Sequence, residues 1–139
     1  MTVQTFTRQA DSRGDAHIID ITDEVLECVD EAGITNGTVS LFVPGSTAGL
    51  TTVEYEPGVV RDVRDCFDRV APVDMPYAHE AAWHDGNGHS HVRAALLGAS
   101  LVVPIHQGRP VLGTWQQVVL IDFDNKPRQR TWTATVIGE

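Results

Sequence analysis

The chain has 139 residues, 42% of them hydrophobic, and a formal net charge of −9 at pH 7. The length predicts one domain, residues 1–139, with enough apolar material for a core. The negative charge argues against nucleic-acid binding, which needs clustered Lys and Arg, and no apolar stretch reaches the roughly 18 residues of a membrane helix. The start of the chain does not read as a secretory signal. Two distant cysteines, Cys28 and Cys66, predict a reducing, cytoplasmic location and two small buried side chains.

The first half of the chain alternates between strand and helix patterns. Polar and apolar residues alternate over residues 2–8 and 17–21, which predicts strands. A helix is expected to follow, with Thr22 as its N-cap and Gly33 at its end. Two further strands are predicted over residues 38–44 and 47–53.

The second half predicts a helix that begins near Pro57 and ends before Pro72. Residues 71–90 read as a long polar loop, a kind of segment that is often functional in a small domain. A short helix is then expected, followed by three strands; the ranges are 91–97, 100–105, 111–123 and 130–137. Many strands with few helices indicate an α+β fold: β-sandwich-like antiparallel sheets with two or three short helices packed on one side.

The polar loop concentrates residues that bind metals. Four of the six histidines fall within thirteen positions, among carboxylates and amides: His79, Glu80, His84, Asp85, Asn87, His89, Ser90 and His91. Imidazole and carboxylate groups suit divalent transition metals. In an extended segment, His89 and His91 would point to the same side. The alternative is a set of solvated loop histidines, and the residues alone leave both open.

Two more groups of residues are candidates for a site. Glu54 follows a predicted strand and could project into a pocket, whereas Asp65 on the next helix reads more simply as a solvated residue. Strand alternation would put Thr114 and Gln116 on one face, with Trp115 in the core. Bidentate phosphate contacts could come from three arginines, Arg93, Arg128 and Arg130, each of which could equally be a surface residue.

Three segments resemble the YjbQ family closely. They are SLVVPIHQG at residues 100–108, LGTWQQV at residues 112–118, and NGHSHVRAALLG at residues 87–98. The resemblance implies an α+β fold built around a β-sandwich and a homotrimer with sites near subunit boundaries. It also implies thiamine-phosphate synthase activity as a secondary reaction, in which a pyrimidine pyrophosphate and a thiazole phosphate are joined and pyrophosphate is released.

The resemblance also implies roles for individual residues. His79, His91, Glu54 and Asp65 are expected to be catalytic, and Thr114 and Gln116 to bind substrate. Apart from the resemblance, Arg93 and Arg130 are the positive groups available to bind the substrate's phosphate oxygens. His79 and His91 are candidate ligands of zinc or magnesium. One departure stands out, because the family histidine expected at position 45 is Gly45 here; His89 is the candidate replacement.

Three functions follow as hypotheses. The first is the thiamine-phosphate-synthase-like transferase, with a small anionic metabolite as its partner molecule. The second is a metal-dependent hydrolase of a small phosphorylated or ester substrate, in which the histidines would hold an activated water. The third is a non-catalytic trimeric binder of an anionic metabolite, which the glycine at position 45 favours.

Overall fold

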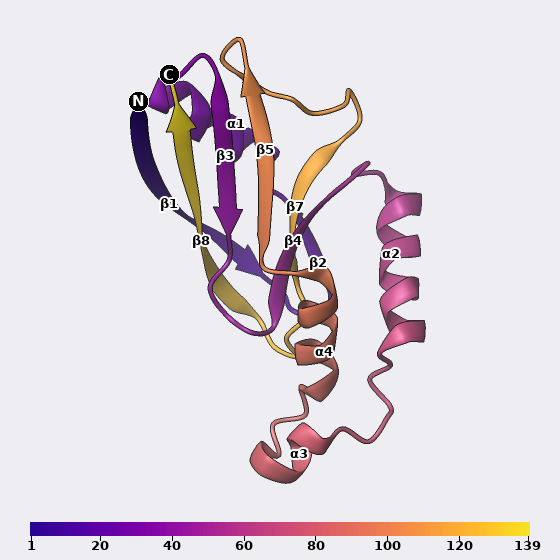
Figure 1. Cartoon of the computed structure of the whole chain (residues 1–139). Helices are drawn as coiled ribbons and strands as arrows, with labels where there is room; N and C mark the ends of the chain where they lie inside the picture. Colours follow the sequence, from indigo (N-terminus) through magenta and orange to yellow (C-terminus); the bar gives the residue numbers. More distant parts are fainter.

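A computed structural model describes residues 1–139 as eight strands and four helices (Figure 1). The strands are β1 (Thr2–Ser12), β2 (His17–Asp20), β3 (Gly37–Phe42), β4 (Ala48–Val53), β5 (Ser100–His106), β6 (Arg109–Pro110), β7 (Gln117–Asp122) and β8 (Arg128–Gly138). The helices are α1 (Thr22–Ala32), α2 (Pro57–Val70), α3 (Ala78–Trp83) and α4 (Gly88–Leu97).

The strands form two antiparallel sheets. The larger sheet has the order β1-β8-β3-β5-β6, and the smaller has the order β2-β7-β4. Their inner faces share one core, in which Val39, Val103 and Trp132 of the larger sheet join Leu50 and Leu120 of the smaller one. The alternation of buried and exposed residues along β1 and β8 follows from this arrangement, because the other face of the larger sheet is open.

Three of the helices pack against the sheets. Helix α1 adds Val25, Cys28 and Val29 to the core between the sheets. Helices α2 and α4 cover the outer face of the smaller sheet, where the rings of Phe67 and Phe123 lie 4.7 Å apart. Strand β7 is therefore covered on both faces, and this explains its unbroken apolar run. No helix of this structure has the length and apolar character needed to span a bilayer.

The predicted fold class, an α+β fold with sandwich-like antiparallel sheets, is confirmed. The prediction of two or three helices missed α3, which has six residues and buries no side chain. The helices also do not all pack on one side, because α1 lies in the core between the sheets and α2 and α4 cover the outer face of the smaller sheet. Residues 71–90 are therefore not one loop, because they include α3 and the first turn of α4. The predicted strand over residues 111–123 is wrong for its first half, since β7 begins only at Gln117.

Two smaller predictions are also corrected. The residue before α1 is Ile21 rather than Thr22, and Asp20 accepts hydrogen bonds from both the backbone N–H and the hydroxyl of Thr22. Cys28 is buried as expected, but Cys66 is exposed because it lies on the outward side of α2. The helical apolar pattern therefore predicted burial correctly for Cys28 and wrongly for Cys66.

Candidate functional site

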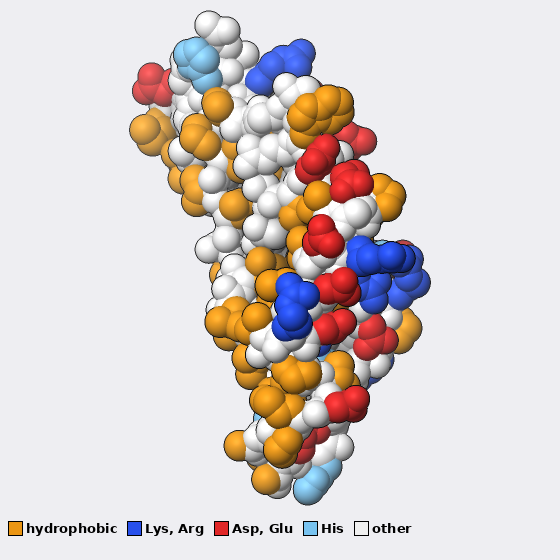
Figure 2. Space-filling model, turned by 90° about the vertical axis from the view of Figure 1, so that its right-hand side faces the viewer, with side chains coloured by type: hydrophobic (Ala, Val, Ile, Leu, Met, Phe, Trp, Pro, Cys, Tyr) orange, Lys and Arg blue, Asp and Glu red, His pale blue; other side chains and the backbone are white.

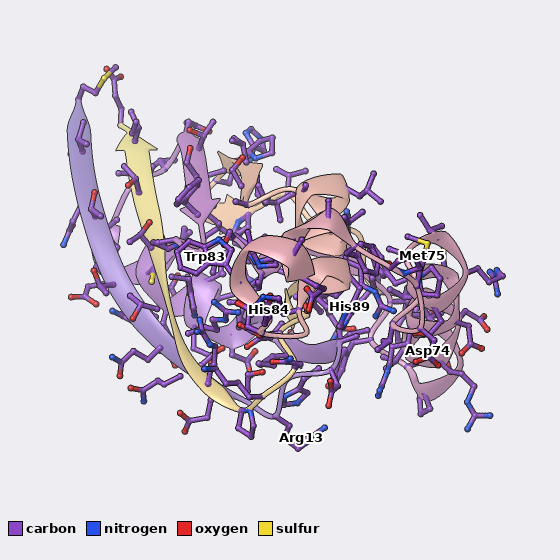
Figure 3. The ribbon with its side chains drawn as sticks, turned by 90° about the horizontal axis from the view of Figure 1, so that it is seen from below. Arg13, Asp74, Met75, Trp83, His84 and His89 are labelled. Atoms are coloured by element: carbon purple, nitrogen blue, oxygen red, sulfur yellow. The ribbon has the colours of Figure 1, made fainter.

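A polar hollow lies at the end of the sandwich where the β3–β4 loop, α3, the start of α4 and the β7–β8 turn meet. Its volume is about 400 Å³, and ten residues line it: Gly45, Ser46, Thr47, His79, Trp83, Asp85, Asn87, His91, Asp124 and Arg128. Seen from this end, Trp83 ends α3 and His84 follows it, while Asp74 and Met75 lie across from them in the segment between α2 and α3 (Figure 3). The hollow thus gathers side chains from four separate segments.

Two predicted site residues meet in this hollow. The ring centroids of His79 and His91 lie 4.4 Å apart. His79 Nε2 also lies 3.2 Å from Asp85 Oδ1. The fold therefore brings together His79 and His91, twelve positions apart in the sequence, and adds a carboxylate.

The amide of Asn87 completes a cluster with these two groups. Its nearer side-chain atom lies 2.8 Å from Asp85 Oδ1 and 3.1 Å from His79 Nε2, and its other amide atom lies 3.4 Å from Asp124 Oδ1. If the nitrogen faces His79 and Asp85, the amide oxygen faces the Asp124 carboxylate. If the oxygen faces them, two oxygens and an imidazole nitrogen converge. In the first orientation the amide nitrogen donates hydrogen bonds to Asp85 and His79 and gives up its bond to Asp124; in the second it keeps the bond to Asp124.

A divalent cation would satisfy both sides at once. Ligand atoms held about 2.1 Å from one ion, at right angles, lie about 3 Å from each other. The three separations among His79, Asp85 and Asn87 range from 2.8 to 3.2 Å. With its oxygen turned toward the ion, Asn87 keeps its N–H₂ for Asp124. The donor set of imidazole nitrogen, carboxylate and amide oxygen therefore fits a divalent cation.

Glu80 is the other carboxylate near this cluster. One of its oxygens lies within 4.8 Å of a ring nitrogen of His79 and of a carboxylate oxygen of Asp85. One of its oxygens accepts a hydrogen bond of 2.8 Å from the backbone N–H of Gly88, at the start of α4. Glu80 therefore fixes the junction of the two helices and leaves one oxygen for the cluster.

Buried ion pairs form the floor of the hollow. The guanidinium of Arg130 donates to both oxygens of Asp122, at 2.9 and 2.8 Å, and to the hydroxyl of Thr47. Next to this pair, Asp124 lies 3.2 Å from Nε of Arg128. These contacts hold β7, β8 and the β3–β4 loop together at the floor of the hollow.

The carboxylate of Asp124 is held in its charged form. Burial acts to raise its pKa, but the backbone N–H of Asn125, the side chains of Asn87 and Thr47, and the charge of Arg128 together lower it. Arg128 itself is 41% exposed and lines the hollow. Since a guanidinium has five N–H donors, Arg128 keeps donors for a bound anion.

His89 is turned away from the hollow. It is only 3% exposed, with its ring 6.4 Å from that of Tyr77 and its Nε2 3.4 Å from the hydroxyl of Ser90. Burial, followed by the charge of Arg93, lowers the pKa of its imidazole. The expected extended segment is helix α4 instead, where residues two apart point to opposite sides. His89 is therefore not placed with His79 and His91.

Two other predicted site residues lie on or against α2. Arg93 is buried, and its guanidinium donates to the carbonyl of Ala71 at 2.9 Å and to Asp68 at 3.0 Å, which fastens the end of α2 to α4. Asp65 lies on the charged outer face of α2, where acidic and basic side chains are interspersed (Figure 2). Neither side chain lines the polar hollow.

Glu54, Thr114 and Gln116 line a different hollow, of about 640 Å³, together with Trp115 and Arg109. Strand β4 separates the two hollows along the chain, because the segment before it lines the polar hollow and Glu54 follows it. Its six residues place Glu54 roughly 20 Å from the polar hollow. A single chain does not bring these residues together with the histidines. Trp115 is 72% exposed rather than part of the core.

The roles of Thr114 and Gln116 in substrate binding, and those of Arg93 and Arg130, stay predictions. In the structure Gln116 closes a turn, since it accepts a hydrogen bond from the N–H of Gly113 at 3.0 Å and donates to Thr52 at 2.9 Å. Residues 113–116 are thus not extended, and the predicted strand alternation does not apply to them.

Sequence reasoning gave no role to three residues that shape the hollow. Asp85 and Asn87 belong to the loop cluster but were not separated from its other members, and Asp124 was interpreted only as part of a turn. The signal that could have found Asn87 and Asp124 is their polarity next to buried segments. A buried Asn or Asp requires a partner.

Comparisons with known proteins agree with this architecture. The model of the family described as UPF0047 protein YjbQ-like matches residues 6–139. The UPF0047 protein YugU of Bacillus subtilis is 39% identical over 123 residues, which cover 87% of this chain and 89% of that protein. The UPF0047 protein YjbQ of Escherichia coli O157:H7 is 35% identical over 138 residues, which cover 98% and 97%.

Solved structures give the same result. A YbjQ-like protein of unknown function from Sulfolobus solfataricus superposes with a TM-score of 0.90 at 30% identity, covering 99% of this chain and all of that one. An uncharacterized YjbQ/UPF0047 protein from Clostridium acetobutylicum has a TM-score of 0.87 at 36% identity, with 95% and 99% covered. Fold and site define a two-sheet α+β protein with a histidine–carboxylate hollow at one end. The chain belongs to the YjbQ-like UPF0047 family.

Proposed function

We propose that His79, Asp85 and Asn87 bind a divalent cation and that the chain uses this site in a reaction on a small phosphorylated substrate. The observation that supports this most strongly is the convergence of three potential ligand atoms within 2.8 to 3.2 Å of one another. Arg128, in the same hollow, offers donors to the oxygens of a phosphate group.

When bound, a cation such as zinc or magnesium polarises a phosphoryl oxygen and stabilises the negative charge of a leaving phosphate. The mixed nitrogen and oxygen ligands also suit manganese, which makes this ion a convenient probe. The residues of the chain do the rest: Asp124 positions the guanidinium of Arg128, and Arg130 holds the loop that contains Thr47.

His91 is the group best placed to move a proton. Its ring lies next to His79 and lines the hollow, yet His91 is not among the side chains that converge on the cation cluster. In a reaction that releases pyrophosphate, a His91 imidazolium would donate a proton or hydrogen bond to the leaving group. In a hydrolysis, the neutral ring would accept a proton from water.

The reaction proposed first is the thiamine-phosphate-synthase-like joining of a pyrimidine pyrophosphate to a thiazole phosphate. In this reaction the ring nitrogen of the thiazole attacks with its lone pair and loses no proton, so the reaction needs charge stabilisation at the leaving pyrophosphate rather than a base. Hydrolysis of a phosphate monoester at the same site is the alternative, and binding without turnover is the third.

Cation binding is tested by titrating Mn²⁺ into the wild-type chain and into His79→Ala and Asp85→Asn variants in a calorimeter. Each variant should lose at least about tenfold in affinity. The matched control is His84→Asn, which removes a neighbouring exposed imidazole and keeps a residue type that tolerates the left-handed backbone at the end of α3. Unchanged affinity in both site variants, or an equal loss in the control, would contradict the proposal.

Turnover separates the three functions. Release of pyrophosphate from the two thiamine precursors indicates the transferase, release of phosphate from a monoester indicates the hydrolase, and neither indicates the binder. His91→Ala should keep Mn²⁺ affinity and lose about 10²- to 10⁴-fold in the observed rate. A His91 variant that keeps its full rate would remove the proposed role of this residue.

We also propose that the chain forms a homotrimer through the outer face of the larger sheet. Between Asp11 and His106 at its ends, this face presents mostly Thr, Ser and aliphatic side chains, and Val3, Phe42 and Val102 are 65, 48 and 58% exposed. In a chain with a net charge of −9, copies meeting there would avoid like-charge repulsion.

Light scattering after size-exclusion chromatography tests this assembly. The wild-type chain should have the mass of a trimer, and Val102→Lys should reduce it. Val111→Lys, which alters a residue of almost equal exposure outside the sheet face, should not. A monomeric wild-type chain, or a trimer that survives Val102→Lys, would argue against this interface.

A further inference from the structure

A second hollow, of about 430 Å³, adjoins the polar one. Both are lined by Gly45, Ser46 and His91. The other residues that line the second hollow are all small and apolar: Ala48, Ala94, Ala95, Gly98 and Ala99. The two hollows therefore meet at His91 and differ in chemistry, since the second has no carboxylate or guanidinium among its lining residues.

Gly45 lies where the two hollows adjoin. Its φ of +127° is a backbone conformation that residues with side chains rarely adopt. A Cβ atom at this position would have only one neighbour within 4 Å, Nη1 of Arg130 at 3.1 Å. A side chain at position 45 would therefore be strained and would crowd the buried guanidinium of Arg130.

We propose that the second hollow binds the flat, uncharged ring of the substrate whose phosphate group binds at the cation cluster. The inference rests on the proposed function and specifies its substrate class: a phosphate ester of an aromatic or similarly flat alcohol. Walls made of Ala and Gly give a shallow surface that suits a ring better than a branched or charged group. Covering these apolar walls also removes them from water.

The placement of His91 is consistent with this arrangement. It lines both hollows, so the bond between the ring-bearing part and the phosphate would lie beside its imidazole. Ser46, at the same boundary, can hydrogen-bond to the ester oxygen or to a ring substituent. The recognition of ring and phosphate is thus divided between two neighbouring surfaces.

Two phosphonates, which have the same head group and resist hydrolysis, provide the test. The affinities of 1-naphthylphosphonate and methylphosphonate are measured in the presence of Mn²⁺ with the wild-type chain, with Ala95→Leu and with Ala81→Leu. Burying roughly 60 Å² of ring at about 25 cal/mol per Å² corresponds to about tenfold in affinity. Ala95 is exposed and lines the second hollow, whereas Ala81 is an exposed helical alanine that lines neither hollow.

The wild-type chain and Ala81→Leu should bind the naphthyl compound about tenfold more tightly than the methyl compound. Ala95→Leu should lose this difference and keep its affinity for methylphosphonate. Equal affinities for both compounds in the wild-type chain, or an unchanged preference in Ala95→Leu, would overturn the inference alone. Failure of the wild-type chain to bind either phosphonate would overturn the proposed function and this inference with it.

Discussion

The buried pair of Arg130 and Asp122 gives a quantitative prediction. Arg130 is 5% exposed and Asp122 is fully buried. Replacing Arg130 with Met would leave the Asp122 carboxylate inside the protein with one remaining donor, the backbone N–H of Asp124 at 3.0 Å. Breaking a buried ion pair in this way costs about 3–5 kcal/mol. For a chain of this size, the melting temperature should fall by about 10–20 °C.

Urea denaturation followed by tryptophan fluorescence measures this change. The control Arg128→Met removes a half-exposed partner of Asp124 and should cost less than about 1 kcal/mol. Changing both partners, as Arg130→Met with Asp122→Leu, should recover most of the loss, because an apolar pair leaves no buried charge. If Arg130→Met keeps wild-type stability but weakens phosphate binding, the assignment of Arg130 to the floor of the hollow is refuted and the sequence-based prediction of substrate binding is favoured.

Two further predictions concern titratable groups. Cys66 should react with a thiol reagent in the folded chain, whereas Cys28, whose pKa is raised by burial, should react only on unfolding; equal rates would contradict this. Burial, then the charge of Arg13, lowers the pKa of His17 from 6.5. As the pH falls below about 6.5, the unfolded chain takes up this proton first and stability decreases. His17→Asn should show a smaller decrease between pH 7.5 and 5.5, and an identical pH profile would exclude this role.

The sequence predicted the layers of the fold better than the site. Alternation in β1 and β8 reflects one covered and one open face, and the apolar stripe of α1 reflects its place in the core. Strand β7 gives no such alternation, because both of its faces are covered. Helix α3 is too short to show a helical period, so its residues read as a loop.

The histidine cluster shows why a site is harder to predict. Its composition indicated a metal site. Which side chain lies beside His79, His89 or Asn87, depends on the conformation of the segment in which α4 begins. A strand would have aligned His89 with His91, and the helix separates them. For Arg93 and Arg130, the sequence shows the charge but not the residue that each one pairs with. Arg93 pairs with Asp68, 25 positions away, and Arg130 pairs with Asp122, 8 positions away.

Anomalous diffraction from a crystal soaked in Mn²⁺ would locate a cation bound to His79, Asp85 and Asn87. One strong peak is expected between His79 Nε2, the Asp85 carboxylate and the amide oxygen of Asn87, with the Asn87 nitrogen facing Asp124. No peak in this hollow at saturating Mn²⁺, or a peak at His89, would contradict the proposed cation site.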